Sequence, residues 1–495
     1  MNYISTRDKS IKTTAAGAIS QGISVEGGLF VPDTFPIFTK ADFEKLCDMD
    51  YVGRAKYVLK NFLNDFTDDE IDYCVKGAYI GSFDDEQPAP ISVLGENANI
   101  LELWHGPTCA FKDLALQLLP YLLTTSAKKV SAGKKIVILV ATSGDTGKAA
   151  LEGFCDVPNT EIMVFYPSDG VSPMQKLQMD SQKGENVHVC AIKGNFDDAQ
   201  TGVKKIFTNN EVKDKLAENN MQFSSANSIN WGRLAPQIVY YVSAYCDLLK
   251  REGDRINNGF NIVVPTGNFG NILAAYYAKK MGVPVKKLIC ASNKNNVLTD
   301  FINTGKYDRN RSFYTTMSPS MDILISSNLE RMLFELSGED DKAVAKMQKD
   351  LSDSGTFTVS AEIKEKMSEL FFGGCCDDND TLKTINDLFN EYGYLCDTHT
   401  AVAMNVYKQY VEKTGDDIPT VIASTASPYK FANSVLSAVS DQKGDSEFDT
   451  VRVLSDVTKT EIPTPIKALE TATVRFKEIR EKDDMLNAVY SALNI

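Results

Sequence analysis

Short runs of apolar residues, many of them β-branched, recur between about residues 96 and 440, and most precede a glycine-containing turn and a helical pattern. The runs are KIVILVA ending at Ala141, EIMVFYP ending at Pro167, HVCAIKG ending at Gly194, NIVVPTG ending at Gly267, KLICASN ending at Asn293 and TVIASTA ending at Ala426. This alternation is typical of parallel strands covered by helices. It predicts an α/β architecture with two sheets or one large sheet.

The flanking regions have different patterns. Residues 1 to 95 combine helical stretches such as FEKLCDMDYVGRAKYVLKNFL with the punctuated turn GGLFVPDTFP, which predicts a separate N-terminal unit. Between about 300 and 390, charged sequence such as GEDDKAVAKMQKDLSDS indicates a solvated helical insertion. The last stretch, VRFKEIREKDDMLNAVYSALNI, has helical spacing, so residues 441–495 are predicted to form a helical tail that closes the surface.

Composition narrows the possible partners. The net charge of -14 repels nucleic-acid backbones and anionic lipids, so we expect neither as a partner. The ten cysteines are scattered and predict neither a disulfide framework nor a metal site. Apolar runs fall short of the roughly 20 residues that span a bilayer. We therefore expect a cytoplasmic protein, in which any anionic substrate needs a locally basic or amide-rich pocket.

The first candidate for chemistry is the turn in PTGNFGNILAAYYAKKMG, which follows a buried run and opens a helical pattern near Gly270. Glycines let the backbone curl, and free N–H groups at a helix start favour a phosphate dianion. A lone G-x-x-G is more often an ordinary turn, so this feature needs support from elsewhere.

The second candidate is the loop in VATSGDTGKAALEGF. It is not a Walker A loop, because Thr142 stands at the first glycine position and Ala149 follows Lys148 where Ser or Thr is required. The hydroxyls of Thr142, Ser143 and Thr146 cluster at a helix start, which suits a carboxylate. Plain helix capping accounts for one such residue but not for the cluster.

The third candidate is Lys112 in ELWHGPTCAFKDLALQLLP, between Phe111 and Leu114. A lysine in an apolar setting loses its proton more readily, and the neutral amine is the form that attacks an aldehyde. Taken alone, a lysine that extends its head to solvent from a helix is the commoner case.

Together, HGPTCAFKD, ATSGDTG and PTGNFGN resemble the fold-type II pyridoxal-phosphate (PLP) enzymes, and most closely the threonine synthase family. The resemblance extends to STRD with GGLFVP, to SANSINWGR and to STASPYKF. It implies a tryptophan synthase β-like fold in which a PLP-binding region, residues 96–440, contains a smaller subdomain at about 136–230.

The resemblance also implies roles for individual residues. Lys112 binds PLP covalently, and the cofactor phosphate is cradled by Gly267, Asn268, Phe269, Gly270 and Asn271. Thr425 faces the pyridine nitrogen as a neutral partner. The loop that contains Thr142, Ser143, Asp145 and Thr146 binds the substrate carboxylate, with Asp145 where many related PLP enzymes have Asn.

For the substrate phosphate, the resemblance implies a site formed by Asn227, Ser228 and Arg233, with Thr146 nearby. The implied reaction converts O-phospho-L-homoserine and water to L-threonine and phosphate, in a monomer or weak dimer. Two alternatives stay open. One is another fold-type II lyase, such as a serine or threonine dehydratase or a β-replacing synthase, whose substrates carry no terminal phosphate for Arg233. The other is a relative that binds PLP or a phosphorylated ligand without turnover.

Overall fold

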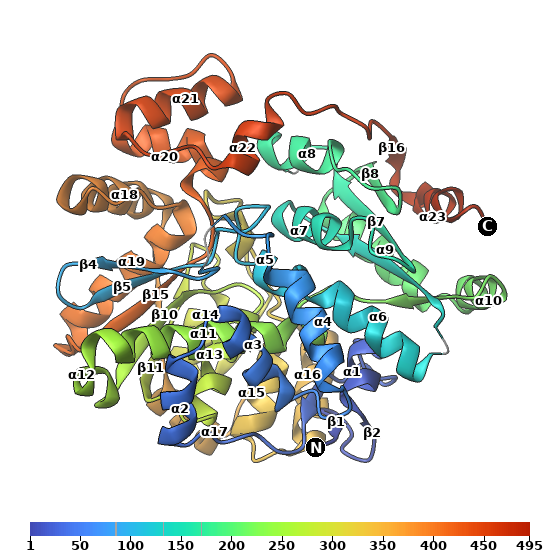
Figure 1. Ribbon diagram of the computed structural model, residues 1–495, viewed down its shortest axis with the longest axis horizontal. Helices are drawn as coiled ribbons and strands as arrows, with labels where there is room; N and C mark the ends of the chain where they lie inside the picture. The colour runs from blue at the N-terminus through green and yellow to red at the C-terminus, as the bar shows by residue number, and fades with distance from the viewer. Residues whose placement is uncertain (85–86, 132, 170) are drawn as a thin grey trace.

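The computed structural model describes residues 1–84, 87–131, 133–169 and 171–495, and two sheets organise it (Figure 1). The strands of the larger sheet are, in spatial order, β14 (Phe371–Cys375), β11 (Val285–Ser292), β10 (Phe260–Pro265), β15 (Thr420–Ser424), β5 (Ala98–Glu102) and β4 (Ile91–Leu94). Only β4 runs antiparallel to its neighbour.

The smaller sheet is parallel throughout. Its order is β16 (Ile479–Glu481), β8 (Val187–Lys193), β7 (Thr160–Pro167), β6 (Lys135–Ala141) and β9 (Met221–Ser224). All six apolar runs therefore lie on strands, and the predicted α/β fold with two sheets is confirmed.

Strand β6 shows why such runs lack alternation. Ile136, Ile138 and Val140 pack into the large core shared with the rest of the molecule, whereas Val137 and Leu139 pack into a separate core on the outer face. Both faces of the strand are covered, so every position favours an apolar side chain.

Helices cover both sheets. Those between residues 113 and 304 are α5 (Asp113–Leu116), α6 (Leu119–Val130), α7 (Asp145–Phe154), α8 (Pro173–Asp180), α9 (Phe196–Thr208), α10 (Asn210–Glu218), α11 (Trp231–Glu252), α12 (Asp254–Asn257), α13 (Gly270–Lys280) and α14 (Val297–Thr304). The later helices are α15 (Leu329–Leu336), α16 (Asp341–Ser354), α17 (Ala361–Leu370), α18 (Asp378–Tyr392), α19 (Thr398–Thr414), α20 (Ala432–Val439), α21 (Glu447–Thr458), α22 (Thr464–Leu469) and α23 (Met485–Leu493). Short 3-10 turns are η1 (Pro319–Met321), η2 (Pro428–Phe431) and η3 (Lys482–Asp484).

The N-terminal region forms a small antiparallel sheet and four helices. Its elements are β1 (Tyr3–Ser5), β2 (Lys12–Thr13), α1 (Ala15–Gln21), β3 (Phe30–Pro32), α2 (Lys40–Cys47), α3 (Tyr51–Lys60) and α4 (Asp68–Tyr79). Asp50 divides the predicted helical stretch, because its Oδ1 accepts a hydrogen bond from Gly53 N at 2.7 Å and starts α3 as an N-cap. Tyr3 and Leu59 share one core with Trp231 of α11, so this region packs firmly onto the rest of the chain.

The prediction of a helical insertion between 300 and 390 is only partly right. The segment FFGGC forms β14 and adds an edge strand to the larger sheet, and β12 (Lys306–Asp308) pairs with β13 (Thr356–Thr358). The two glycines of β14 weaken the strand signal in the sequence. Gly373 allows α14, and Gly374 allows α19, to pack closely against this strand.

The predicted C-terminal helix is right only for the second half of the stretch. Within VRFKEIREKDDMLNAVYSALNI, η3 and α23 are helical, whereas Ile479–Glu481 form β16 beside β8. Figure 1 shows the red segment passing from α21 and α22 to the edge of the smaller sheet. Charged residues on a three-residue edge strand give no apolar run, which is why the pattern missed it. In the described ranges, no helix is long and apolar enough to cross a membrane.

Candidate active site

Lys112 lies immediately before α5, with only 9% of its surface exposed. Its Nζ donates a hydrogen bond to Ser320 Oγ at 3.3 Å and lies 3.6 Å from Asp145 Oδ2. Burial lowers the pKa of Lys112 to about 8, although the charge of Asp145 opposes this shift. A neutral amine is therefore accessible near neutral pH, as covalent binding of an aldehyde requires.

Thr425 is tied to the same segment. Its carbonyl oxygen accepts a hydrogen bond from Phe111 N at 2.9 Å, one residue before Lys112 along the chain. The contact extends β15 toward the start of α5, and Thr425 is 6% exposed. The end of a central strand thus brings this predicted cofactor residue beside the lysine.

Asp145, at the start of α7, is a buried anion between two buried lysines. Its Oδ1 lies 2.8 Å from Lys430 Nζ and accepts a hydrogen bond from Gln175 Nε2 at 3.1 Å, while its Oδ2 accepts one from Ser320 Oγ at 3.2 Å. Burial alone raises the pKa of a carboxyl group, but Lys430 and Lys112 outweigh it and hold this pKa far below its usual range. Asp145 therefore stays charged.

This geometry argues against Asp145 as a substrate-carboxylate ligand. Its acceptors already serve cations and neutral donors, and a second carboxylate beside it is repelled. The family resemblance implied a role for Asp145 in the carboxylate loop, in which it stands between Ser143 and Thr146. The fold directs its side chain toward Lys112.

The rest of that loop divides into structural and free hydroxyls. Thr142 Oγ1 accepts hydrogen bonds from the N–H groups of Gly144 and Gly147 at 3.0 and 2.9 Å, so it shapes the loop. Ser143 is exposed and Thr146 half-buried, and neither side chain has a hydrogen-bond partner within the described residues. Two hydroxyls and the start of α7 remain available for an anion.

The turn Gly267–Asn271 joins β10 to α13 in the predicted strand–turn–helix order. Phe269 adopts a left-handed φ of +63°, which turns the chain into the helix. A Cβ on Gly267 would lie 2.7 Å from the carbonyl oxygen of Ser320, so a side chain at Gly267 would clash with the backbone beside Lys112. The turn and the lysine therefore belong to one site.

Two buried amide groups at this helix start lack acceptors. Asn271 Oδ1 accepts hydrogen bonds from Tyr240 and Tyr241 at 2.6 and 2.5 Å, and Asn328 Oδ1 accepts one from Arg331 at 2.6 Å. In the described part of the chain, the Nδ2 atoms of both asparagines have no hydrogen-bond partner. Unpaired buried donors are costly, so this set of groups fits a phosphate, which offers only acceptors.

Arg233, in the first turn of α11, is 5% exposed. Its Nη1 donates to the carbonyl oxygen of Ala226 at 2.7 Å, and no carboxylate pairs with it among the described residues. Burial lowers its pKa to about 10, and its charge in turn lowers the pKa of Lys112. A buried guanidinium without an anion, close to Lys112, is prepared for an anionic ligand.

Asn227 and Ser228 precede Arg233 in the same segment. Asn227 is exposed, and Ser228 is half-buried with its Oγ 3.5 Å from Ser327 Oγ. A Cβ on Gly270 would lie 3.8 Å from Ser228 Cβ, so this segment adjoins the turn before α13. The three groups of residues singled out from the sequence thus surround Lys112.

Sequence reasoning missed four residues of this site: Ser320, Gln175, His399 and Lys430. Lys430 stands inside the quoted motif STASPYKF, and a lysine as the single charged residue of that motif was the available signal. Ser320 and His399 come from segments with no recognisable pattern, and only the fold brings them to Lys112.

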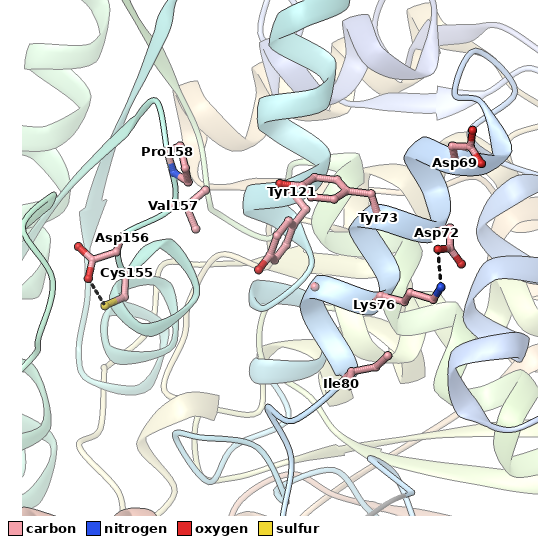
Figure 2. Close-up of a pocket in the computed structure, with 11 residues that line it drawn as sticks. Asp69, Asp72, Tyr73, Lys76, Ile80, Tyr121, Cys155, Asp156, Val157 and Pro158 are labelled. Carbon is pink, nitrogen blue, oxygen red and sulfur yellow. Dashed lines mark hydrogen bonds and ion pairs between the residues drawn. The ribbon is translucent and has the colours of Figure 1, made fainter.

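A separate surface groove of about 800 Å³ lies between α4 and the loop after α7. Figure 2 shows Tyr73 and Tyr121 lining it opposite Cys155 and Asp156, with Lys76 paired to Asp72. None of its lining residues belongs to the sites predicted from the sequence. In the described ranges, no group of three or more His, Cys, Asp or Glu side chains is arranged to hold a metal ion.

Family models match three parts of the chain. "Threonine synthase N terminus" matches residues 2–79, "Pyridoxal-phosphate dependent enzyme" residues 92–358, and "Threonine synthase, C-terminal" residues 400–489. The human protein "Threonine synthase-like 1" is 41% identical over 432 residues, which are 85% of this chain and 57% of that protein. The chain thus spans just over half the length of the threonine synthase-like 1 proteins that it matches.

Other relatives align over nearly their whole length. Threonine synthase from Saccharomyces cerevisiae is 36% identical over 97% of this chain and 95% of that protein. A crystal structure of PLP-bound threonine synthase from Brucella melitensis matches with a TM-score of 0.88 and 36% identity, over 100% of this chain and 99% of that one. The yeast structure also gives 0.88, with 32% identity and the same coverage. The chain therefore belongs to the threonine synthase family of pyridoxal-phosphate-dependent enzymes.

Proposed function

We propose that this protein is a threonine synthase, which converts O-phospho-L-homoserine and water to L-threonine and phosphate. The observation that carries the proposal is the buried, anion-free Arg233 close to Lys112. The substrate carries a terminal phosphate that needs such a cation, whereas the substrates of dehydratases and β-replacing synthases do not. Family membership and the alignments with bacterial and yeast threonine synthases support the same activity.

We assign the residues as follows. Lys112 holds PLP, Gly267–Asn271 cradle its phosphate, and Thr425 faces its pyridine nitrogen. Ser143, Thr146 and the amides of the loop shaped by Thr142 take the substrate carboxylate, and Asn227, Ser228 and Arg233 take its phosphate. Asp145 holds Lys112 and Lys430 in place instead of contacting substrate.

The chain's own groups then perform the reaction. When bound, PLP withdraws electrons from the substrate Cα and so acidifies its proton. Lys112 Nζ removes the Cα proton and then a proton from Cβ, so that phosphate departs from Cγ with the electron pair of the broken C–O bond. Arg233 stabilises the charge on the departing phosphate, and this fixed electrostatic contribution is often the largest in catalysis. Cγ then takes up a proton and becomes the methyl group, water adds its oxygen at Cβ and releases a proton, and Lys112 returns a proton to Cα.

We further propose that the chain acts in the cytoplasm as a monomer or weak dimer, without nucleic acid or membrane. The net charge of -14 supports the part of this proposal that excludes nucleic acid and anionic lipid, because both repel an acidic protein. We retain 1–95, 96–440 and 441–495 as the functional divisions, with 136–230 as the smaller subdomain. The strand β16 connects the last division to that subdomain.

Arg233 provides the test of substrate choice. Losing a hydrogen bond to a charged group costs about 1.5 to 3 kcal/mol, so Arg233→Ala should lower kcat/KM for O-phospho-L-homoserine at least roughly ten- to a hundredfold. Arg233→Lys keeps the charge but loses the forked geometry, so its kcat/KM should lie between those of wild type and Arg233→Ala. Phosphate release measures both, with Arg251→Ala at the far end of α11 as the control.

PLP affinity must be measured on the same variants. We expect it to be unchanged, because the cofactor phosphate lies at the start of α13. If Arg233→Ala loses PLP but keeps its affinity for O-phospho-L-homoserine, the two phosphate sites are reversed. Equal kcat/KM in all variants would show that the protein does not use this substrate phosphate.

The lowered pKa of Lys112 predicts how PLP attaches to the cofactor-free protein. The neutral amine is the nucleophile, so the attachment rate should rise with pH through a midpoint of about 8 and then level off. Absorbance after rapid mixing measures the rate. A midpoint near 10.5, the usual value for lysine, would contradict the burial seen at Lys112.

A further inference from the structure

Ser320 lies between the two charged groups at the centre of the site. Its hydroxyl is 3.3 Å from Lys112 Nζ and 3.2 Å from Asp145 Oδ2. A hydroxyl has a single hydrogen, and the hydrogen bond to an ionised carboxylate is the stronger one. The hydrogen therefore goes to Asp145, and the oxygen lone pairs of Ser320 face Lys112.

An acceptor in this position controls how a lysine presents its amine. Once released to act as a base, a neutral Lys112 that donates one N–H to Ser320 has its lone pair directed away from Ser320. Without that acceptor, the amine rotates about its terminal C–N bond and competes for Asp145, 3.6 Å away. Proton transfer depends steeply on such alignment.

The backbone of Ser320 is held from two sides. Its N–H donates to His399 Nε2 at 3.2 Å, and its carbonyl oxygen faces the Cα of Gly267, where a side chain would clash. His399 is 2% exposed and packs against Phe431, with ring centroids 5.0 Å apart. The imidazole is thus a fixed support for the Ser320 backbone.

His399 accepts this bond only as the tautomer that carries its proton on Nδ1. Asp397 enforces that tautomer, because its Oδ2 lies 2.7 Å from His399 Nδ1 and the carboxylate accepts the proton's hydrogen bond. Asp397 is fully buried and also caps α19 through the N–H groups of His399 and Thr400. The helix cap and the histidine tautomer are therefore fixed together.

We propose that Ser320 is a catalytic residue that aims the Lys112 amine, and that His399, oriented by Asp397, is the positioning residue that places Ser320. This inference rests on the proposed function for the reaction that it serves. The contact of Ser320 with Lys112 is independent of that function. It can be tested without turnover.

The first measurement uses cofactor-free protein and added PLP. Ser320 stabilises the ammonium form of Lys112 by accepting its hydrogen bond, so Ser320→Ala should lower the midpoint pH of PLP attachment by roughly one unit. Ser312→Ala, an exposed serine of the same connecting segment, is the matched control and should keep the wild-type midpoint. A Ser320→Ala midpoint equal to wild type overturns the proposal.

The second measurement follows exchange of the Cα hydrogen of L-threonine with D2O by proton NMR on the holoenzyme. Ser320→Ala should slow exchange roughly ten- to a hundredfold while the PLP content stays at the wild-type level. If wild type neither exchanges this hydrogen nor releases phosphate, the proposed function fails, while the attachment midpoint still decides the role of Ser320. If Ser320→Ala exchanges the Cα hydrogen at the wild-type rate, Ser320 does not aim the Lys112 amine and the proposal is overturned.

His399 is tested by replacement and by its tautomer. His399→Leu should slow exchange of the Cα hydrogen of L-threonine without changing the KM for L-threonine. His399→Gln keeps a hydrogen-bond acceptor and should recover much of the wild-type exchange rate. His188→Leu removes an imidazole paired with Glu161 on the smaller sheet and should exchange like wild type. A folded His399→Leu with the wild-type rate overturns the positioning role.

A readout on wild-type protein removes any dependence on the folding of variants. The chain has only three histidines, so their ring nitrogens are readily assigned by nitrogen-15 NMR. We expect the proton of His399 on Nδ1 with Nε2 unprotonated. A proton on Nε2 overturns the proposal, because that nitrogen then cannot accept from Ser320.

Discussion

Replacing Lys112 by alanine should abolish turnover and leave a protein that no longer binds PLP covalently. The variant loses both the amine that captures the cofactor and the base that moves the protons, and a positioned base alone contributes about 10²- to 10⁴-fold. We therefore expect phosphate release to fall at least about a thousandfold. Wild type should be yellow, lose its colour on borohydride reduction, and carry PLP on Lys112 by mass spectrometry.

Lys148 gives a matched control for this experiment. It is also a buried lysine close to a loop–helix junction, but its Nζ pairs with Glu152 at 2.8 Å and with Gln182, and among the described residues its side chain makes no hydrogen bond or ion pair with Lys112, Asp145 or Ser320. Lys148→Ala should stay yellow and retain PLP on Lys112. A colourless wild-type protein that takes up no added PLP would contradict the assignment of the cofactor site.

The pattern of the chain was sufficient for the sheets and for the loops at their ends. Apolar runs such as KIVILVA are covered on both faces, and each glycine-containing turn lies where a strand meets a helix. The edges of the sheets were not predictable in the same way. β14 contains two glycines and β16 is three charged or exposed residues long, so neither presents the apolar signal of a central strand.

The polar centre of the site shows a second limit. Lys112 and Asp145 were found because each lies in a motif, but the hydroxyl that bridges them belongs to Ser320, which is 208 residues from Lys112. A local sequence pattern contains no information on which distant hydroxyl lies between Lys112 and Asp145. The family resemblance suggested which ligand each loop binds. The direction of the Asp145 side chain follows instead from Lys430, whose Nζ the fold brings to 2.8 Å from Asp145 Oδ1.

Asp145 should be among the residues whose loss destabilises the protein most. Its carboxylate is the only one within 4 Å of Lys112 and Lys430 in the described part of the chain, and the Lys430 side chain is 0% exposed. Removing one partner of a buried ion pair typically costs about 3 to 5 kcal/mol, because the remaining charge is left without compensation. We expect a loss of that size for Asp145→Asn in the free energy of unfolding of cofactor-free protein at pH 7.

The pH dependence of the free energy of unfolding, and a double variant, show whether the lost ion pair causes the destabilisation of Asp145→Asn. The pKa of Asp145 is lowered in the folded state, so its contribution is complete above the unfolded value of about 4 and declines as the pH falls below it. The difference between wild type and Asp145→Asn should therefore shrink in acid. Adding Lys430→Met should restore part of the stability lost in Asp145→Asn, because the stranded cation is removed. If the losses of the two single variants simply add, the ion pair does not stabilise this site, and Asp145 and Lys430 contribute through separate contacts.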